Sequence, residues 1–286
     1  MYPMPKVKII ADSTCDLSRE LLERYDVAVV PLYVTLGDQS YRDGVDMTVD
    51  QLFAHCDSTH EVPKTAASSV SDFIEAFRPF CEAGQDIVFL GISGHFSVQI
   101  QNALLAAQEF PERTIRCVDS QNLSTGIGLL VIEAAERAQA GMGANEIADA
   151  VEALRPKVNA GFVLDTLTYL RRGGRCSGLA ALGAAMLNIK PQISVIDGKM
   201  APTDKFRGHI RRVTQRYVDK QLADIERIRP RRVFLTHCCW PQDWLEEICE
   251  HVRARGYFEE VLTTSAGCVI SSHCGPNCIG ILFMEK

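Results

Sequence analysis

The chain has 286 residues, of which 47% are hydrophobic and 23% are charged, and its formal net charge is −6 at pH 7. This composition is typical of a globular protein with one large or two ordinary domains. The acidic balance argues against a nucleic-acid-binding protein, because such proteins usually carry a basic excess or a basic face. No apolar run approaches the roughly 20 residues that span a bilayer, and the first residues do not form a leader peptide. We therefore expect a cytoplasmic protein with no stable membrane insertion.

The first half of the chain alternates short apolar runs with amphipathic segments, and the apolar runs are of the kind found in parallel sheets. Two local signals refine this pattern. Ser13, Thr14 or Asp16 is expected to cap the first helix, and Asp43-Gly44 is expected to form a hairpin turn. The predicted elements are, in order, a strand at 7–12, a helix after it, a strand at 27–36, helices at 49–56 and 69–81, a strand at 86–93, a helix at 97–109, a strand at 114–120 and two helices that end at Pro156.

The second half has a different pattern, with a hairpin and longer helices. We expect two α/β domains, 1–158 and 159–286, with a mainly parallel sheet in the first. The predicted elements are a strand at 160–165, a small-residue helix at 178–188, a hairpin over 191–206 that turns at Asp197-Gly198, a helix at 209–228, a strand at 231–238, a helix at 244–255, and strands at 259–264 and 279–285.

Polar residues follow several predicted strands, at the edge where open parallel sheets bind their ligands. Together these groups predict a shared anion site, and the alternative is repeated capping of helix N-termini. The groups are Asp12-Ser13-Thr14, the segment from Ser93 to Ser97, Asp119-Ser120, and a loop that carries Lys64, Thr65, Ser68 and Ser69.

A glycine pair, Gly173-Gly174, separates two arginines from Arg175 at the start of an apolar segment. The glycines let the backbone turn sharply and bring the Arg175 guanidinium to a site. His273 lies in the segment "SSHCGPNCIG". It is either a structural turn residue or a hydrogen-bond donor near an anion.

The eleven cysteines are expected to be buried thiols that act as small apolar residues. Their odd number and the lack of a secretory signal argue against a disulfide scaffold. Their spacing matches no standard zinc pattern, so we expect no metal. The alternative is a metal cluster built from neighbouring residues: Cys238, Cys239, Cys274, Cys278, His237 and His273.

No sequence pattern indicates a catalytic site. The chain contains no G-x-S-x-G elbow, no P-loop and no dinucleotide fingerprint. We therefore expect no cofactor.

Seven short motifs, spread in order over nearly the whole chain, resemble the DegV family. Members of that family resemble the fatty-acid-binding subunit of bacterial fatty acid kinase. The motifs are "DSTCDL" at 12–17, "YRDGVDM" at 41–47, "PKTAAS" at 63–68, "ISGHFSVQIQNA" at 92–103, "VDSQNLSTGIG" at 118–128, "TLTYLRRGGRCS" at 166–177 and "SSHCGPNCIG" at 271–280.

The resemblance implies a two-domain α/β fold with a ligand tunnel between the domains. It also implies that Thr65 and Ser93 bind the carboxylate of a long-chain fatty acid. Arg175 and His273 would hold or process the headgroup, as candidate catalytic residues. The chain itself would not be an enzyme. It would present the fatty acid to a separate ATP-dependent kinase subunit with a dihydroxyacetone-kinase-like domain, and the acyl phosphate formed there would serve phospholipid synthesis.

The chain departs from the family pattern in two of its motifs. Family members often read "SSGLSGTYQSA" where this chain has "SGHFSVQIQNA", so His95, Phe96, Val98 and Gln99 are atypical. Asn277 replaces a glycine, and asparagine tolerates a positive φ better than other residues with a side chain.

The apolar segment after Arg175 is expected to contact the lipid tail, with close helix packing as the alternative. Two other classes of function stay open. One is a stand-alone transferase or esterase that acts on a hydrophobic acid, and the other is a regulatory protein that senses a small ligand.

Overall fold

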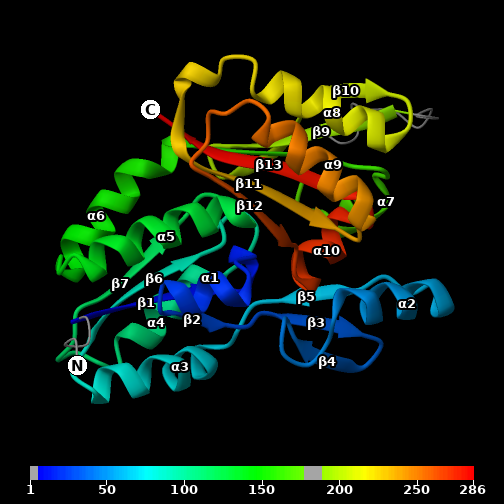
Figure 1. Cartoon of the computed structure of the whole chain (residues 1–286). Helices are drawn as coiled ribbons and strands as arrows, with labels where there is room; N and C mark the ends of the chain where they lie inside the picture. Colours follow the sequence, from blue (N-terminus) through cyan, green and yellow to red (C-terminus); the bar gives the residue numbers. More distant parts are fainter. Residues whose placement is uncertain (1–5, 177–188) are drawn as a thin grey trace.

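The computed structural model describes residues 6–176 and 189–286. The helix expected at 178–188 lies outside these residues. The described chain forms three sheets, and Figure 1 shows the four-stranded sheet below the six-stranded sheet, with the small sheet beside them. No helix in the described residues combines the length and the apolar character that crossing a membrane requires.

The first half forms a four-stranded sheet in the order β2-β1-β6-β7, and all its pairings are parallel. Its strands are apolar because helices cover both faces. Helices α3 and α4 cover one face, and α5 and α6 cover the other. The elements are β1 (Val7–Asp12), β2 (Val27–Val30), β6 (Asp86–Gly91), β7 (Ile115–Asp119), α1 (Arg19–Arg24), α3 (Val70–Glu82), α4 (Gln99–Ala107), α5 (Thr125–Gln139) and α6 (Ala144–Leu154).

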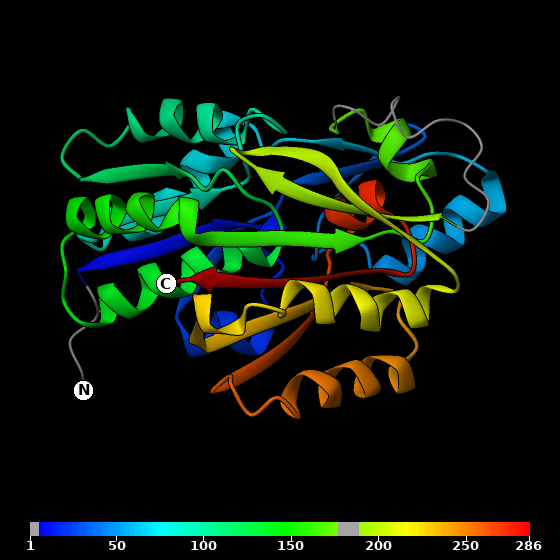
Figure 2. The same cartoon turned by 90° about the horizontal axis from the view of Figure 1, so that it is seen from above.

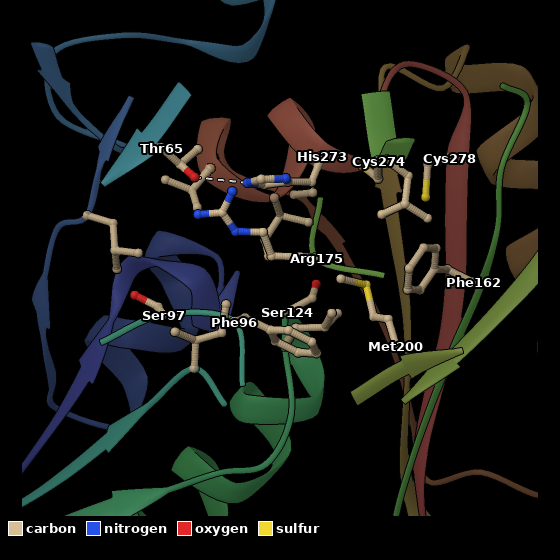
Figure 3. A pocket seen from close by; sticks show the side chains of 18 of the residues that line it. Thr65, Phe96, Ser97, Ser124, Phe162, Arg175, Met200, His273, Cys274 and Cys278 are labelled. Atoms are coloured by element: carbon tan, nitrogen blue, oxygen red, sulfur yellow. Dashed lines mark hydrogen bonds between the residues drawn. The ribbon is translucent and has the colours of Figure 1, made fainter. Parts of the chain in front are cut away.

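The second half forms a six-stranded mixed sheet in the order β10-β9-β8-β13-β11-β12. Helices α8 and α9 cover its outer face, where Figure 2 shows them in yellow and orange, while α5 packs against the inner face. Helix α5 therefore lies between the two large sheets. The elements are β8 (Val158–Val163), β9 (Ile189–Ile196), β10 (Lys199–Arg207), β11 (Ile228–Cys238), β12 (Glu260–Ser265), β13 (Cys278–Glu285), α7 (Thr168–Gly173), α8 (Ile210–Gln221), α9 (Gln242–Arg253) and α10 (Cys268–Cys274).

A small antiparallel sheet projects from the first half, in the order β4-β3-β5. Helix α10, from the far end of the chain, packs against β3, β5, α2 and α7. This contact brings the motif at 271–280 beside the strand that carries Thr65. The elements are β3 (Tyr33–Leu36), β4 (Gln39–Arg42), β5 (Lys64–Ala66) and α2 (Val49–Thr59).

Three predictions for the first hundred residues were wrong. The strand expected at 27–36 is two strands in two different sheets, because Pro31 cannot donate to a ladder and interrupts it. The hairpin turn lies at Gly37-Asp38, between β3 and β4, and Asp43-Gly44 follows β4 instead. Ser18 caps α1, and Asp12 caps the short 3-10 turn that precedes it.

In the second half, the hairpin predicted at Asp197-Gly198 is confirmed, with φ angles of 48° and 75° at these residues. The helix expected at 209–228 is shorter, since α8 ends at Gln221 and a 3-10 turn follows at Ile225–Arg227. Helix α10 was not predicted, and neither was strand β5 in the first half.

Candidate functional site

A cavity of about 390 Å³ lies where the loops after the parallel strands face the six-stranded sheet and α10. Most of its wall is apolar. Phe162 and Met200 come from the six-stranded sheet, and Phe96 comes from the loop after β6. The cavity therefore suits a hydrophobic ligand of some length.

The polar end of the cavity is built around a hydrogen bond between Thr65 Oγ1 and His273 Nε2, at 2.9 Å. Thr65 lies on β5 and His273 on the last turn of α10, so residues 208 positions apart in sequence meet here. Burial, and then the charge of Arg175, lower the pKa of His273 to about 4. The imidazole is therefore neutral at pH 7.

The surroundings of the His273 ring assign its tautomer. Nδ1 is buried and has no hydrogen-bond partner within the described residues. A buried N–H without an acceptor is rarer in proteins than an unpaired acceptor, so the proton belongs on Nε2. His273 then donates to Thr65, and the hydroxyl hydrogen of Thr65 stays available to a ligand.

The glycine pair at the end of α7 lets the two helices that frame the site approach each other. A Cβ atom on Gly173 would lie 2.1 Å from His273 Nδ1, so only glycine fits there. Gly174 has a φ of 67° and ends α7 in the left-handed conformation. Directly after α10, a Cβ on Gly275 would lie 2.5 Å from Tyr169 Cδ2. These close approaches place Arg175 next to His273.

Arg175 supplies the positive charge of the site. Its guanidinium lines the cavity beside Thr65 and His273, and it donates to Gly173 O at 2.7 Å. Within residues 6–176 and 189–286 it forms no ion pair with a carboxylate. An exposed cation without an acidic partner is suited to receive an anion.

Ser93 lies next to the cavity but does not line it, whereas Ile92 and Gly94 do. The Ser93 side chain is fully buried, and its hydroxyl donates to Gly198 O at 2.7 Å. The structure therefore brings Thr65, Arg175 and His273 together and turns the fourth predicted residue toward the β9–β10 hairpin.

Several other polar groups predicted at the strand ends accept hydrogen bonds from backbone N–H groups and do not line the cavity. Asp12 accepts from Thr14 N, Thr14 Oγ1 and Ile92 N, and burial raises its pKa to about 6. Asp119 accepts from Gly94 N, and Ser69 caps α3. The capping alternative therefore accounts for Asp12 and Ser69, whereas Asp119 binds the loop after β6. Fewer of the predicted polar groups reach the cavity than the sequence suggested.

Several lining residues were not singled out as site residues from the sequence. Ser124 lines the cavity, and so does Thr236 on β11. Ser97, which belongs to one of the predicted anion-binding groups, lines it too. Phe96 and Val98, which are atypical for the family, form part of the apolar wall. Their role could not be read from pattern, because the loop that carries them has no periodicity.

The turn at the end of the last motif has the conformation expected from its sequence. Asn277 has a φ of 57°, as predicted for the residue that replaces a glycine. The backbone there is left-handed, and asparagine tolerates it.

Three cysteines of the predicted cluster form part of the cavity wall and do not form a metal site within the described residues. Cys238, Cys274 and Cys278 line the cavity. Outside this cluster, burial raises the pKa of the Cys176 thiol to about 11 and that of Cys268 to about 12, so these two thiols stay protonated. Within the part of the chain that the structure describes, no three acidic, histidine or cysteine side chains are arranged to hold a metal ion.

Comparisons with known proteins point to one family. A family model described as "Uncharacterised protein, DegV family" matches residues 6–286. A DegV domain-containing protein of Clostridium perfringens is 31% identical, over 99% of this chain and 100% of that protein.

Two solved structures extend the likeness to the fold. One, titled as fatty acid binding of a DegV family protein from Thermus thermophilus, is 32% identical, with a TM-score of 0.89, and covers 98% of this chain and 99% of that chain. A stearic acid-binding protein from Eubacterium ventriosum is 27% identical, with a TM-score of 0.81, and covers 98% of each chain.

Proposed function

The chain belongs to the DegV family, and on this premise we propose that its cavity binds a long-chain fatty acid. The carboxylate would lie at Thr65, His273 and Arg175, and the acyl chain would follow the apolar wall. Relatives with solved structures bind fatty acids, including the proteins of T. thermophilus and E. ventriosum. No cofactor or metal is needed for this function.

The observation that carries the proposal is the Thr65–His273 hydrogen bond beside Arg175, at one end of an otherwise apolar cavity. Arg175 has no acidic partner among the residues that the structure describes. A carboxylate leaves water only if hydrogen bonds and charge replace its hydration. The hydroxyl of Thr65 and the guanidinium of Arg175 can supply both. Burial of the tail then contributes about 0.8 kcal/mol per CH₂, before the cost of ordering the chain.

Ser93 can bind the fatty acid carboxylate only if its hydroxyl group exchanges one hydrogen-bond acceptor for another. Its hydroxyl has one hydrogen, which is donated to Gly198 O. To bind a carboxylate, the hydroxyl would rotate away from Gly198 and donate to the ligand instead. Fatty acid binding would therefore loosen the contact between the β9–β10 hairpin and the loop after β6.

The finer part of the proposal is that the protein presents its fatty acid to a separate ATP-dependent kinase subunit in the cytoplasm. Arg175 and His273 would assist there, because phosphorylation converts a carboxylate into a more highly charged acyl phosphate. The kinase subunit would carry the dihydroxyacetone-kinase-like domain, and the product would enter phospholipid synthesis. Two domains, 1–158 and 159–286, would enclose the ligand between them.

A stand-alone transferase or esterase receives less support from the geometry. Thr65 and His273 are a hydroxyl and an imidazole in contact, as in a nucleophile–base pair. Such a pair also needs a third group that orients the imidazole. His273 Nδ1 instead faces Gly173 and has no carboxylate partner within the described residues.

The proposal is tested by extracting purified protein and identifying the ligand by mass spectrometry, followed by titration of delipidated protein with palmitate and oleate. We expect a bound acid of long chain and saturable binding. Ser93→Ala, measured beside the parent, should bind more weakly if the hydroxyl exchanges partners. No binding at any chain length would rule out the function.

A further inference from the structure

The first two motifs of the chain, "DSTCDL" and "YRDGVDM", contribute no residue to the cavity wall, yet both supply a buried carboxylate. Asp16 is 5% exposed and Asp43 is 3% exposed. Neither forms an ion pair with a cation of the described chain. Burial of a carboxylate costs free energy unless hydrogen bonds replace its hydration, so the partners of Asp16 and Asp43 must be identified.

Both carboxylates bind the first turn of the helix that carries His273. Gly267 N donates to Asp16 Oδ1 at 2.8 Å, and Cys268 N donates to Asp43 Oδ1 at 2.7 Å. These are the orphan N–H groups of the helix start, and Gly267 itself has no side chain that could cap them. The first half of the chain therefore caps a helix of the second half.

The second oxygen of each carboxylate is also held. Ser13 Oγ donates to Asp43 Oδ2 at 2.8 Å and accepts from Leu32 N, which ties Asp43 to the start of the small sheet. Ser124 Oγ donates to Asp16 Oδ2 at 2.6 Å, and Ser124 itself lines the cavity. Each acid is thus fixed on one side and bonded to α10 on the other.

We propose that Asp16 and Asp43 are positioning residues that hold α10, and with it His273, against Thr65 and the fatty acid head. Helix α10 has seven residues, so its first and last turns are nearly adjacent. A shift of the capped end therefore moves His273 relative to β5. The proposal rests on the proposed function for its consequence on binding, but the placement of His273 can be measured without any ligand.

The test compares Asp43→Ala with Asp43→Asn. Alanine removes the acceptor for Cys268 N. Asparagine keeps an oxygen for Cys268 N, but it removes the charge and puts an NH₂ donor where Asp43 Oδ2 accepts from Ser13 Oγ. We expect Asp43→Ala to bind oleate roughly fivefold more weakly, which is the shift that one lost cap produces. Asp43→Asn should restore most of the affinity, and Asp16→Ala should resemble Asp43→Ala.

The second measurement is the pKa of the His273 imidazole, determined by an NMR titration of histidine-labelled protein. The variant His273→Asn assigns the signal. The groups that face this ring are Thr65 on β5 and the Arg175 guanidinium. Burial of the ring is the larger cause of its lowered pKa, and the charge of Arg175 is the smaller one. Asp43→Ala should raise the pKa from about 4 by about one unit or more, because a displaced ring regains water. Asp43→Asn should leave it near the parent value.

A loss of stability alone does not mimic this result. Phe77→Leu, in the separate apolar cluster under α3, should lower the melting temperature and leave both the affinity and the His273 pKa unchanged. If Asp43→Ala does not fold, Ser13→Ala replaces it, because it removes one of the hydrogen bonds that fix Asp43.

The two proposals fail in different ways. An unchanged His273 pKa in Asp43→Ala, or in Ser13→Ala where that variant replaces it, overturns the positioning role, whatever the protein binds. Absence of oleate binding by the parent overturns the proposed function, and the imidazole measurement then decides the positioning role by itself.

Discussion

Thr65 shows how much a single side chain determines at this site. Its hydroxyl is fixed by His273 as an acceptor, which leaves one hydrogen for the ligand. The direction of that hydrogen bond follows from the tautomer of His273, which burial keeps neutral at pH 7 with its proton on Nε2. A charged imidazole would itself attract the ligand carboxylate, and the carboxylate would then bind His273 as well as Thr65.

We expect Thr65→Val to weaken fatty acid binding by roughly ten- to a hundredfold, because a lost hydrogen bond to a charged group costs about 1.5–3 kcal/mol. Thr65→Ser keeps the hydroxyl and is the matched control, with an affinity near that of the parent. Calorimetry on delipidated protein measures both. Equal binding by the valine variant would place the carboxylate elsewhere.

The buried His273 also predicts a pH dependence of stability. Its folded-state pKa is about 4, below the ordinary 6.5, so the unfolded chain binds the proton more readily between these values. The contribution is fully present above pH 6.5 and is lost as the pH falls toward 4, by about 3 kcal/mol for the shift of this size. Urea unfolding of parent and His273→Asn from pH 7 to pH 4 should show a steeper loss in the parent. Parallel curves would contradict the burial of a neutral ring.

At the scale of elements, the close contact between α7 and α10 depends on two glycines, Gly173 and Gly275. We expect Gly173→Ala to destabilise the protein strongly, because its Cβ would lie 2.1 Å from His273 Nδ1. Gly141→Ala is a reference for backbone strain alone, since Gly141 has a φ of 86° with nothing within 4 Å. Thermal unfolding should rank Gly173→Ala as the more destabilised. Adding His273→Ala should restore much of the loss, and failure of this rescue would mean that another clash dominates.

The elements that sequence predicted well are those with strong local signals. The apolar runs of β1 and β6 and the hairpin at Asp197-Gly198 follow from residue type and periodicity. The pairing partners of β3 and β5 do not, because Lys64–Ala66 becomes a strand only where β3 offers it a ladder. Helix α10 could not be predicted from local sequence for a similar reason. The groups that cap its N-terminus are Asp16 and Asp43, more than 200 positions earlier in the sequence.

The candidate site was predicted through family resemblance rather than through spacing. Thr65, Arg175 and His273 do meet at one end of the cavity. The partner of Ser93 could not be foreseen, because Gly198 is 105 positions away and lies on a hairpin tip whose docking depends on the whole fold.

For the whole molecule, binding and headgroup chemistry should be separable. We expect Arg175→Ala and His273→Ala each to bind fatty acid within roughly tenfold of the parent, or about 1.4 kcal/mol, because tail burial supplies most of the affinity. With a cognate kinase subunit and ATP, both should lose acyl phosphate formation far more severely. Fatty-acid-dependent ATP consumption, measured beside binding, checks this. Full activity of both variants would remove them from the reaction, and turnover without a partner would favour the stand-alone enzyme.

Helix α5 has a consequence for how the molecule unfolds. It is almost entirely buried, and its residues belong to one apolar cluster that also contains Val88 of the parallel sheet and Phe234 of the six-stranded sheet. Neither half can therefore lose its packing without exposing the core of the other, and we expect a single cooperative transition in calorimetry, with equal calorimetric and van't Hoff enthalpies. A ligand that binds only the native state would then raise the melting temperature of both halves together. A fragment that ends at residue 158 should not fold by itself, because α5 would expose the face that packs against β8 and β13.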